Sequence, residues 1–189
     1  MKFFSSDHHF GHANVIKYSN RPFSSVEEMN QYMIDKWNSV VKTEDTVYHV
    51  GDFSFLNKEK SKEILSKLNG YIILIKGNHD STETRMKEIG FKEVYNDLVI
   101  EIAGKKVLLC HFPFAPKEKP TEYDLKYMNL RPKNEGQWLI HGHVHQHWKV
   151  QFKMINVSVE NWDYTPVSMD TMETLIKENP DGFGHAGKV

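Results

Sequence analysis

Polar residues that can bind metal ions or transfer protons follow five strand-like segments of the chain, at the point where each segment ends. The clusters are Asp7-His8-His9, Gly51-Asp52, Gly77-Asn78-His79-Asp80, His111 and His141-Gly142-His143-Val144-His145. Buried strands consist mainly of Val, Ile and Leu, and folding does not require each of them to end in Asp, Asn or His. Functional sites of open α/β sheets lie beyond the carboxyl ends of the strands, so we expect the five clusters to converge.

Histidine is unusually frequent in this sequence. The chain of 189 residues contains 11 His, including His141, His143, His145 and His147 in one short stretch. Histidine is the commonest metal ligand and the usual acid–base group near neutral pH. The surplus therefore indicates metal binding, acid–base chemistry or both.

A set of cluster residues has side chains suited to a divalent metal ion: Asp7, His9, Asp52, Asn78, His111, His143 and His145. They offer carboxylate oxygen, amide oxygen and imidazole nitrogen but no thiolate, a mixture that suits Mn, Fe, Zn or Ni better than a soft metal. The set is too large for one catalytic ion, which keeps a position open for water, and a pair of ions that share one carboxylate fits better. Two ions about 3.5–4 Å apart can convert a bridging water into hydroxide and clamp the oxygens of an in-line phosphoryl displacement.

The composition narrows the class of protein. Lys and Arg together number 24 against 25 Asp and Glu, so the net charge of -1 argues against binding of nucleic acid through bulk positive charge. No apolar run approaches the roughly 18 residues of a membrane span, and the first residues lack the apolar core of a signal peptide. The single cysteine, Cys110, cannot form an internal disulfide. We therefore expect a cytoplasmic protein of one domain.

The elements that must position these clusters alternate along the first half of the chain. Short apolar segments at 2–6, 46–50 and 71–76 predict strands. Apolar residues recur at three- and four-residue intervals over 26–41, after the capping-box pair Ser25 and Glu28, and a second helix is predicted over 57–68. The order of strands and helices predicts an α/β fold with parallel pairing at its centre.

The second half is predicted to be richer in strands. Segments 98–102 and 105–110 flank Ala103-Gly104 as a hairpin. Further strands are expected at 138–141, 148–153 and 155–159, before a helix over 169–177 that Ser168 caps. The Pro-containing segment 115–133 is predicted to be a loop with one helix near 122–130, and we expect substrate specificity to depend on it. Residues 1–180 are predicted to form the single domain and 181–189 a flexible tail.

The five clusters, in their order along the chain, resemble the signature blocks of the calcineurin-like metallophosphoesterase family. The matching residues are Asp7-x-His9, Gly51-Asp52, Gly77-Asn78-His79-Asp80, His111 and Gly142-His143-x-His145. In size the chain is similar to the small single-domain members from bacteria, archaea and phages. The resemblance implies a four-layer α/β sandwich, in which two mixed β-sheets are flanked by helices, with a dinuclear metal centre at the sheet edge and a small phosphate ester as substrate.

The resemblance also implies a role for each residue. Carried over by position, it implies that one ion is bound by Asp7, His9, Asp52 and His145 and the other by Asp52, Asn78, His111 and His143, with Asp52 as the bridge. His79 matches the family's histidine that protonates the leaving group or stabilises the transition state, a role that acid–base chemistry also favours for a protonated His. The adjacent Asp80 is expected to orient His79.

Two residues outside the signature blocks are candidate contacts of the substrate phosphate. His12 lies three residues after His9, so the short spacing predicts that it lies near the site. Arg21 lies in a predicted loop, and an arginine can bind a phosphate through two parallel N–H groups.

One block departs from the protein Ser/Thr phosphatases of the family. Those proteins carry Gly-Asp-x-x-Asp-Arg-Gly, whereas this chain reads Gly51-Asp52-Phe53-Ser54-Phe55-Leu56-Asn57 and lacks the second Asp and the Arg. The departure argues against protein dephosphorylation. We prefer the interpretation that the protein hydrolyses a phosphodiester, and a diester derived from a nucleotide is one candidate substrate. The alternative within this family is that the protein is a phosphomonoesterase that acts on a small metabolite.

Two other classes of protein remain as alternatives. The run from His143 to Trp148 is similar to the motif of the histidine-triad nucleotide hydrolases, which need no metal, but that interpretation leaves Asp7, Asp52 and Asn78 unexplained. Some proteins of the calcineurin-like fold are interaction platforms without catalysis. A platform has no need of a complete site, and here every ligand position is filled.

Overall fold

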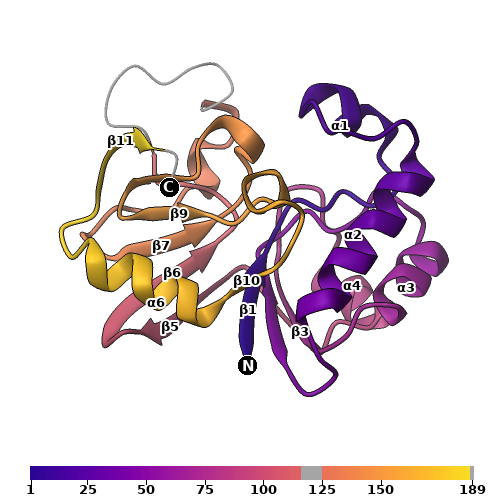
Figure 1. Cartoon of the computed structure of the whole chain (residues 1–189), viewed down its shortest axis with the longest axis horizontal. Helices are drawn as coiled ribbons and strands as arrows, with labels where there is room; N and C mark the ends of the chain where they lie inside the picture. The colour runs from indigo at the N-terminus through magenta and orange to yellow at the C-terminus, as the bar shows by residue number, and fades with distance from the viewer. Residues whose placement is uncertain (116–124, 188–189) are drawn as a thin grey trace.

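Two mixed β-sheets pack against each other at the centre of the computed structural model, which describes residues 1–115 and 125–187 (Figure 1). The first sheet has the strand order β10-β1-β2-β3-β4. Its parallel strands are β1 (Lys2–Ser5), β2 (Thr46–His49), β3 (Tyr71–Ile75) and β4 (Glu93–Tyr95), and the short β10 (Val167–Ser168) pairs antiparallel with β1.

Helices connect the parallel strands of the first sheet. The connection from β1 to β2 contains α1 (Ala13–Tyr18) and α2 (Val26–Val40), followed along the chain by α3 (Lys58–Ser66) and α4 (Glu83–Ile89). Ser25 caps α2 as predicted, because its hydroxyl accepts a hydrogen bond from the N–H of Glu28. The three helices α2, α3 and α4 lie together beside the first sheet, on the right in Figure 1.

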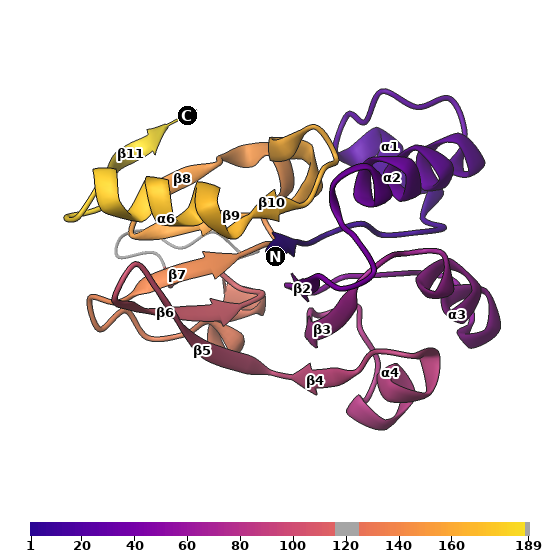
Figure 2. The ribbon, with the colours of Figure 1, turned by 60° about the horizontal axis from the view of Figure 1, so that its bottom comes forward.

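The second sheet has the order β11-β8-β9-β7-β6-β5. Its strands are β5 (Asp97–Ile102), β6 (Lys105–Cys110), β7 (Trp138–His141), β8 (Val150–Phe152), β9 (Met154–Asn156) and β11 (Phe183–Gly187). Ala103 and Gly104 join β5 to β6 with φ angles of 52° and 71°, which is the backbone of a two-residue hairpin turn. Further helices are η1 (Met128–Leu130), η2 (His145–His147), η3 (Val159–Trp162) and α6 (Met169–Glu178), and α6 runs alongside the second sheet (Figure 2).

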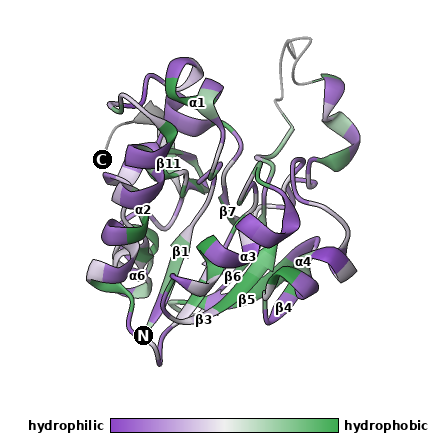
Figure 3. Ribbon diagram, turned by 90° about the vertical axis from the view of Figure 1, so that its right-hand side faces the viewer, coloured by the Kyte–Doolittle hydropathy of each residue, from purple (hydrophilic) through white to green (hydrophobic). Residues whose placement is uncertain are grey.

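Alternation along the strands explains why the sheets and helices form layers. Neighbouring residues point to opposite faces of a strand. Phe3 accordingly packs in a core with residues of α2, α3 and α4, such as Met33, whereas Phe4 packs in a second core with residues of the other sheet and of α6, such as Leu109 and Met172. Hydrophobic residues concentrate on the central strands, and hydrophilic residues appear on the helices (Figure 3).

The predicted α/β class with two mixed sheets and flanking helices is confirmed, and the differences concern short elements. The sequence did not predict α1, α4 or β4, and the strand expected at 155–159 ends at Asn156. The flexible tail predicted over 181–189 is corrected for Phe183–Gly187, which forms β11, because Phe183 packs its ring against Trp138 and the strand pairs with β8. Within segment 115–133, residues 116–124 lie outside the described residues, and these include the first three residues of the helix expected near 122–130. The end of that expected helix forms the short helix η1.

Among the helices of the described residues, none has both the length and the apolar character needed to cross a membrane.

Candidate metal centre

The predicted ligand residues converge at the carboxyl ends of the strands of both sheets. They follow β1, β2, β3, β6 and β7, and they come within a few ångströms of one another although up to 138 residues separate them in sequence, as for Asp7 and His145. The structure thus brings together all seven residues that the sequence singled out as ligands.

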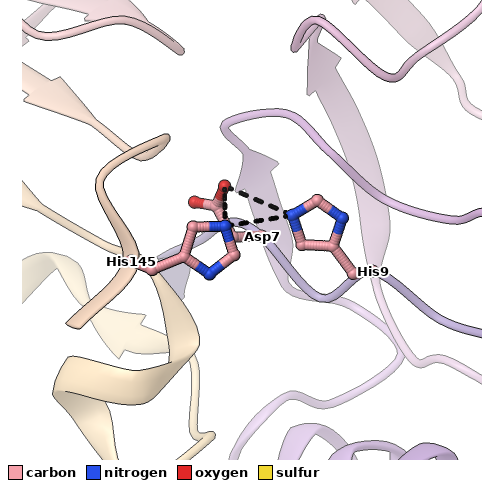
Figure 4. Close-up of side chains that lie close together, drawn as sticks. All are labelled: Asp7, His9 and His145. Carbon is pink, nitrogen blue, oxygen red and sulfur yellow. Dashed lines mark hydrogen bonds and ion pairs between the residues drawn. The ribbon is translucent and has the colours of Figure 1, made fainter. Parts of the chain in front are cut away.

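The first group of ligand atoms belongs to Asp7, His9 and His145 (Figure 4). The two Nε2 atoms of His9 and His145 lie 3.2 Å apart, and Oδ1 of Asp7 lies 3.8 Å from the first and 3.7 Å from the second. Two ligand atoms about 2.1 Å from one ion at right or tetrahedral angles lie about 3.0–3.4 Å apart. The group therefore has nearly the spacing that a single divalent ion requires.

The second group of ligand atoms surrounds the imidazole of His111. Its Nε2 lies 3.2 Å from Oδ1 of Asn78, 3.3 Å from Nδ1 of His143 and 3.5 Å from Oδ2 of Asp52. Asp7, Asp52 and His111 also offer ligand atoms that lie within 4.8 Å of one another. Asp7 consequently faces this group as well as the first.

Asp52 lies between the two groups. Its Oδ2 is 3.6 Å from Nε2 of His9 in the first group and 3.5 Å from Nε2 of His111 in the second. Its other oxygen, Oδ1, accepts a hydrogen bond of 2.9 Å from the backbone N–H of His79. One oxygen thus anchors the side chain, and the other faces both groups.

The backbone of the candidate ligands is strained. Asp7, His9, Asp52, His143 and His145 have φ angles of 57°, 51°, 58°, 70° and 47°. Residues other than Gly rarely adopt positive φ, and such conformations cluster at functional sites, where the surrounding structure enforces them. Five of the seven candidate ligands share this backbone conformation, which also occurs outside the ligand groups at Asn20, Ala103, Phe152, Asp163 and Tyr164.

Glycines let the ligand loops approach each other closely. A Cβ atom at Gly77 would lie 2.2 Å from Oδ1 of Asp52, and one at Gly142 would lie 2.3 Å from Oδ2 of Asp7. Both distances are shorter than any non-bonded contact of a real side chain, so these positions require Gly.

Hydrogen bonds orient the carboxylate of Asp7. Its Oδ2 accepts hydrogen bonds from the hydroxyls of Ser6 and Ser158, at 2.6 and 2.7 Å, and from the N–H of His143 at 3.0 Å. Neither serine was predicted as a site residue. These donors hold Asp7 so that Oδ1 faces the histidines of the first group.

The electrostatics of the centre favour a bound cation. Burial lowers the pKa of His111, but the carboxylates of Asp52 and Asp7 outweigh burial and raise that pKa to about 10. Burial raises the pKa of Asp52, but the neighbouring His111 outweighs burial and holds that pKa well below the usual range of a carboxyl group. Both carboxylates are therefore ionised, and a divalent ion would replace the proton that His111 otherwise carries.

A cavity of about 320 Å³ opens over the candidate ligands. Its lining includes the ligands His9, His143 and His145 together with His12, Val15, Tyr18, Ser19, Phe55, His79, Gln146 and His147. Phe55 was not predicted as a site residue, yet its ring lies against His12 and His79, with centroid distances of 4.0 and 4.6 Å.

His79 lies beside the ligand groups and faces the cavity. Its side chain is 43% exposed, and its Nε2 lies 4.0 Å from Oδ2 of Asp52. Burial lowers the pKa of His79, and the carboxylate of Asp52 opposes this effect only in part. This position suits a group that exchanges a proton with a substrate in the cavity.

His12 also lines the cavity, as its short distance from His9 in sequence predicted. It is the N-cap of α1, because its Nδ1 accepts a hydrogen bond of 2.9 Å from the N–H of Val15. An imidazole that accepts a hydrogen bond through Nδ1 carries its hydrogen on Nε2, so His12 has one N–H left to donate.

The structure corrects the role expected of Asp80. Its carboxylate accepts hydrogen bonds from the backbone N–H groups of Asp52, Phe53 and Gly77, at 2.8, 3.1 and 2.8 Å, instead of orienting the imidazole of His79. Asp80 thereby joins the loop after β2 to the loop after β3.

The structure also corrects the role expected of Arg21, because its guanidinium is fully buried and does not face the cavity. Its Nε and Nη2 donate hydrogen bonds to Oε1 of Glu160, at 3.0 and 2.7 Å. Its Nη2 and Nη1 donate to the backbone carbonyls of Asp7 and His8. Glu160 is a site residue that the sequence did not reveal, because no pattern links it to a partner 139 residues away.

Comparisons with known proteins agree with this geometry. The family model of the calcineurin-like phosphoesterase superfamily domain matches residues 4–160. An uncharacterized protein of Methanocaldococcus jannaschii is 43% identical over 183 residues, which cover 92% of this chain and 89% of that protein. The Gene 66 protein of Mycobacterium phage L5 is 28% identical over 196 residues, which cover 92% of each chain.

A solved structure is also similar. A protein of unknown function from Aquifex aeolicus is 33% identical and has a TM-score of 0.70, with 93% of this chain and 99% of that chain covered. The range that the family model matches contains every candidate ligand. The chain therefore belongs to the calcineurin-like phosphoesterase superfamily.

Proposed function

We propose that this phosphoesterase is a dinuclear, metal-dependent phosphodiesterase. The position of Asp52 carries the proposal, since its Oδ2 lies 3.6 Å from Nε2 of His9 and 3.5 Å from Nε2 of His111. A carboxylate oxygen at similar distances from two ligand groups has the position of a bridge between two ions.

The residues at the centre fit two divalent ions such as Mn, Fe, Zn or Ni. Asp7, His9, Asp52 and His145 would hold one ion, and Asp52, Asn78, His111 and His143 would hold the other. The donors are oxygen and imidazole nitrogen, and the carboxylates are buried beside histidines. The distances between neighbouring ligand atoms, from 3.2 to 3.8 Å, are close to those around one ion. When bound, such ions neutralise the charge of a phosphate ester and lower the pKa of a coordinated water.

His79 would supply a proton to the oxygen of the leaving alcohol. Its imidazole is exposed to the cavity and lies beside Asp52 without belonging to either ligand group. His12 would donate its remaining N–H to an oxygen of the phosphate. Phe55, which contacts both imidazoles, would limit the positions that they adopt.

The charge of the cavity favours a diester over a monoester. Among the described residues, neither Lys nor Arg lines the cavity, and Val15, Tyr18 and Phe55 give it an apolar wall. A phosphomonoester carries about 1.5–2 negative charges at neutral pH, and the second of these would lack a cationic side chain here. A diester carries one charge and has a second organic group, which the apolar wall can accommodate.

The alternatives that the sequence left open are weaker. Membership of the calcineurin-like superfamily argues against a histidine-triad hydrolase. A platform without catalysis does not need seven ligand side chains that converge beside a cavity, or an imidazole such as that of His79 that faces this cavity.

Hydrolysis of two model substrates tests the proposal. We expect metal-depleted protein, given Mn²⁺ again, to hydrolyse bis(p-nitrophenyl) phosphate faster than p-nitrophenyl phosphate, and to lose both activities in EDTA. A faster reaction with the monoester would overturn the diesterase assignment, and rates that EDTA leaves unchanged would overturn the metal dependence.

A further inference from the structure

We propose that the buried pair of Arg21 and Glu160 holds the ligands of the first group in place and thereby sets the affinity of that group for a divalent ion. The inference rests on the proposed function, because it assigns to the pair a positioning role toward the ion that Asp7, His9 and His145 would share. It replaces the substrate contact that the sequence suggested for Arg21.

Glu160 orients the ring of His145. Nδ1 of His145 lies 2.7 Å from Oε1 of Glu160. A carboxylate oxygen only accepts, so Nδ1 carries the hydrogen, and the lone pair of His145 is on Nε2, the atom that lies 3.2 Å from Nε2 of His9. An outer partner of this kind fixes the tautomer and orientation of a metal-binding histidine.

The backbone of His145 is held from the same segment. Side-chain amides of Asn156 and Asn161 donate hydrogen bonds to its carbonyl at 2.7 and 2.6 Å. The φ angle of His145 is 47°, so these bonds hold a conformation that the residue would not adopt by itself. Ring and backbone of this ligand are therefore both fixed by residues between 156 and 161.

Arg21 extends the same support to the turn that contains Asp7 and His9. Its Nη2 donates a hydrogen bond of 2.6 Å to the carbonyl of Asp7, and its Nη1 donates one of 2.8 Å to the carbonyl of His8. The two ligands of this turn have φ angles of 57° and 51°. Arg21 also donates twice to Oε1 of Glu160, the oxygen that contacts His145.

The contacts of the pair indicate more than a contribution to stability. Buried ion pairs often stabilise a fold little, because desolvation offsets their attraction. Here the side chains are 0% and 4% exposed, and every hydrogen-bonding nitrogen of Arg21 serves the turn of the first group or the carboxylate that orients His145. Asn78 and His111 belong to other loops, and the hydrogen bonds of the pair reach His145 but not His143 in the loop after β7. We therefore expect the second group to keep its affinity when the pair is changed.

Calorimetric titration of the metal-free chain with Mn²⁺ tests the inference. Wild type should bind two equivalents, and Glu160→Gln should weaken one of them by about 10- to 100-fold, the usual effect of changing an outer partner, while the other changes by less than about threefold. The neutral amide oxygen of Gln accepts a weaker hydrogen bond from His145 than the carboxylate does. The matched control is Glu178→Gln, which removes the charge of an exposed residue of α6 and should change neither constant. If a folded Glu160→Gln protein binds both Mn²⁺ ions with unchanged dissociation constants, the proposal is overturned.

A double variant separates positioning from stability. Arg21→Met together with Glu160→Leu removes both charges of the pair and leaves neither one buried without its partner, so the thermal unfolding temperature of this variant should be close to or above that of the wild type. We expect it to keep the weakened first site, because His145 still lacks its carboxylate acceptor and retains the neutral hydroxyl of Ser19, 3.0 Å from its Nδ1. This variant decides the question if Glu160→Gln does not fold. Recovery of tight binding together with stability would overturn the proposal. A wild-type chain that binds no divalent ion would instead contradict the proposed function itself.

Discussion

Residues of the metal centre differ in what they contact, and the contacts separate their roles. The candidate ligands direct nitrogen or oxygen atoms at one another within 3.2–3.8 Å. His79 lies at their edge, with a side chain that is 43% exposed. Asp80 and Arg21 direct their side chains at backbone groups of the ligand loops. Ion binding, proton transfer and support can therefore be tested by separate substitutions.

Substitution of His79 should affect catalysis without affecting ion binding. We expect His79→Ala to keep two bound ions but to lower kcat by about 10²- to 10⁴-fold, the usual contribution of a general acid. The loss should be larger for diesters whose alcohol is a poor leaving group. Asp52→Ala should lose ions and activity together. Metal analysis and kinetics with alcohols of different pKa are the measurements, and a His79→Ala protein without metal would show that the role assigned to His79 is wrong.

Substitution of Asp80 should affect stability even without metal. Its carboxylate accepts hydrogen bonds from three backbone N–H groups. A hydrogen bond to a charged group contributes about 1.5–3 kcal/mol to the stability of a fold. Because Asn retains part of this network, we expect Asp80→Asn to lower the free energy of unfolding by about 2–3 kcal/mol in urea titrations with EDTA. The control is Asp181→Asn at an exposed position. An unchanged free energy combined with a selective loss for poor leaving groups would return Asp80 to a role in orienting His79.

The sequence could predict the ligands but not their support. The sequence identified the ligands, such as Asp7, His9 and Asp52, because packing of the core does not explain an Asp or His directly after an apolar strand. Arg21 and Glu160 have no such local signal, since their partnership spans 139 residues and depends on how η3 meets the turn after β1. A buried arginine and a phosphate-binding arginine look the same in sequence.

Strands and helices place the ligand loops, and the sequence predicted the longer elements well. Apolar runs at β1, β2 and β3 and the helical periodicity of α2 carry strong signals. Helix α1 has six residues with Val15 alone buried, and α4 has seven with Met86 and Ile89 buried, so neither is long enough to show a clear period. The end of β9 was missed because Val157 and Val159 continue the apolar run although the chain leaves the sheet.

A substitution in the loop after β7 should disturb the first ligand group. A Cβ atom at Gly142 would lie 2.3 Å from Oδ2 of Asp7 and 2.4 Å from Oγ of Ser6, so one of these side chains must move. We expect Gly142→Ala to weaken Mn²⁺ binding by at least about 10-fold, which is the smaller of the losses usual when a residue that orients a metal ligand is displaced. The added methyl group should also lower the free energy of unfolding by about 1–3 kcal/mol.

The matched control for this substitution is Gly184→Ala, because a Cβ atom there meets nothing within 4 Å. Calorimetry for the ion and thermal unfolding for the fold are the measurements. Equal Mn²⁺ affinity in both alanine variants would show that close approach of this loop to Asp7 is not needed.

The chain as a whole is nearly neutral, but several of its histidines gather at one candidate metal centre. Its net charge is -1, and it contains 11 histidines, of which His9, His111, His143 and His145 belong to the candidate ligand groups. Two bound divalent ions would make the site locally positive, so an anionic ester would be attracted although the chain as a whole is not basic. Both sheets contribute ligands, and bound ions would therefore join the two halves of the fold.

Removal of metal should consequently lower the stability of the whole fold. Ions that bind only the folded chain stabilise it by about 2.7 kcal/mol when the free ion is present at 100 times its dissociation constant. We expect EDTA to lower the Tm of the wild type and of His79→Ala but to leave that of Asp52→Ala almost unchanged. If EDTA lowers the Tm of all three proteins equally, the stabilising ions do not bind at Asp52.

Titration of metal-free protein with Mn²⁺, followed by the rate of diester hydrolysis at each addition, tests the dinuclear centre most directly. We expect activity to require two equivalents per chain, with little hydrolysis until the second ion is bound. Full activity with one equivalent, or without any ion after exhaustive chelation, would contradict a dinuclear phosphodiesterase.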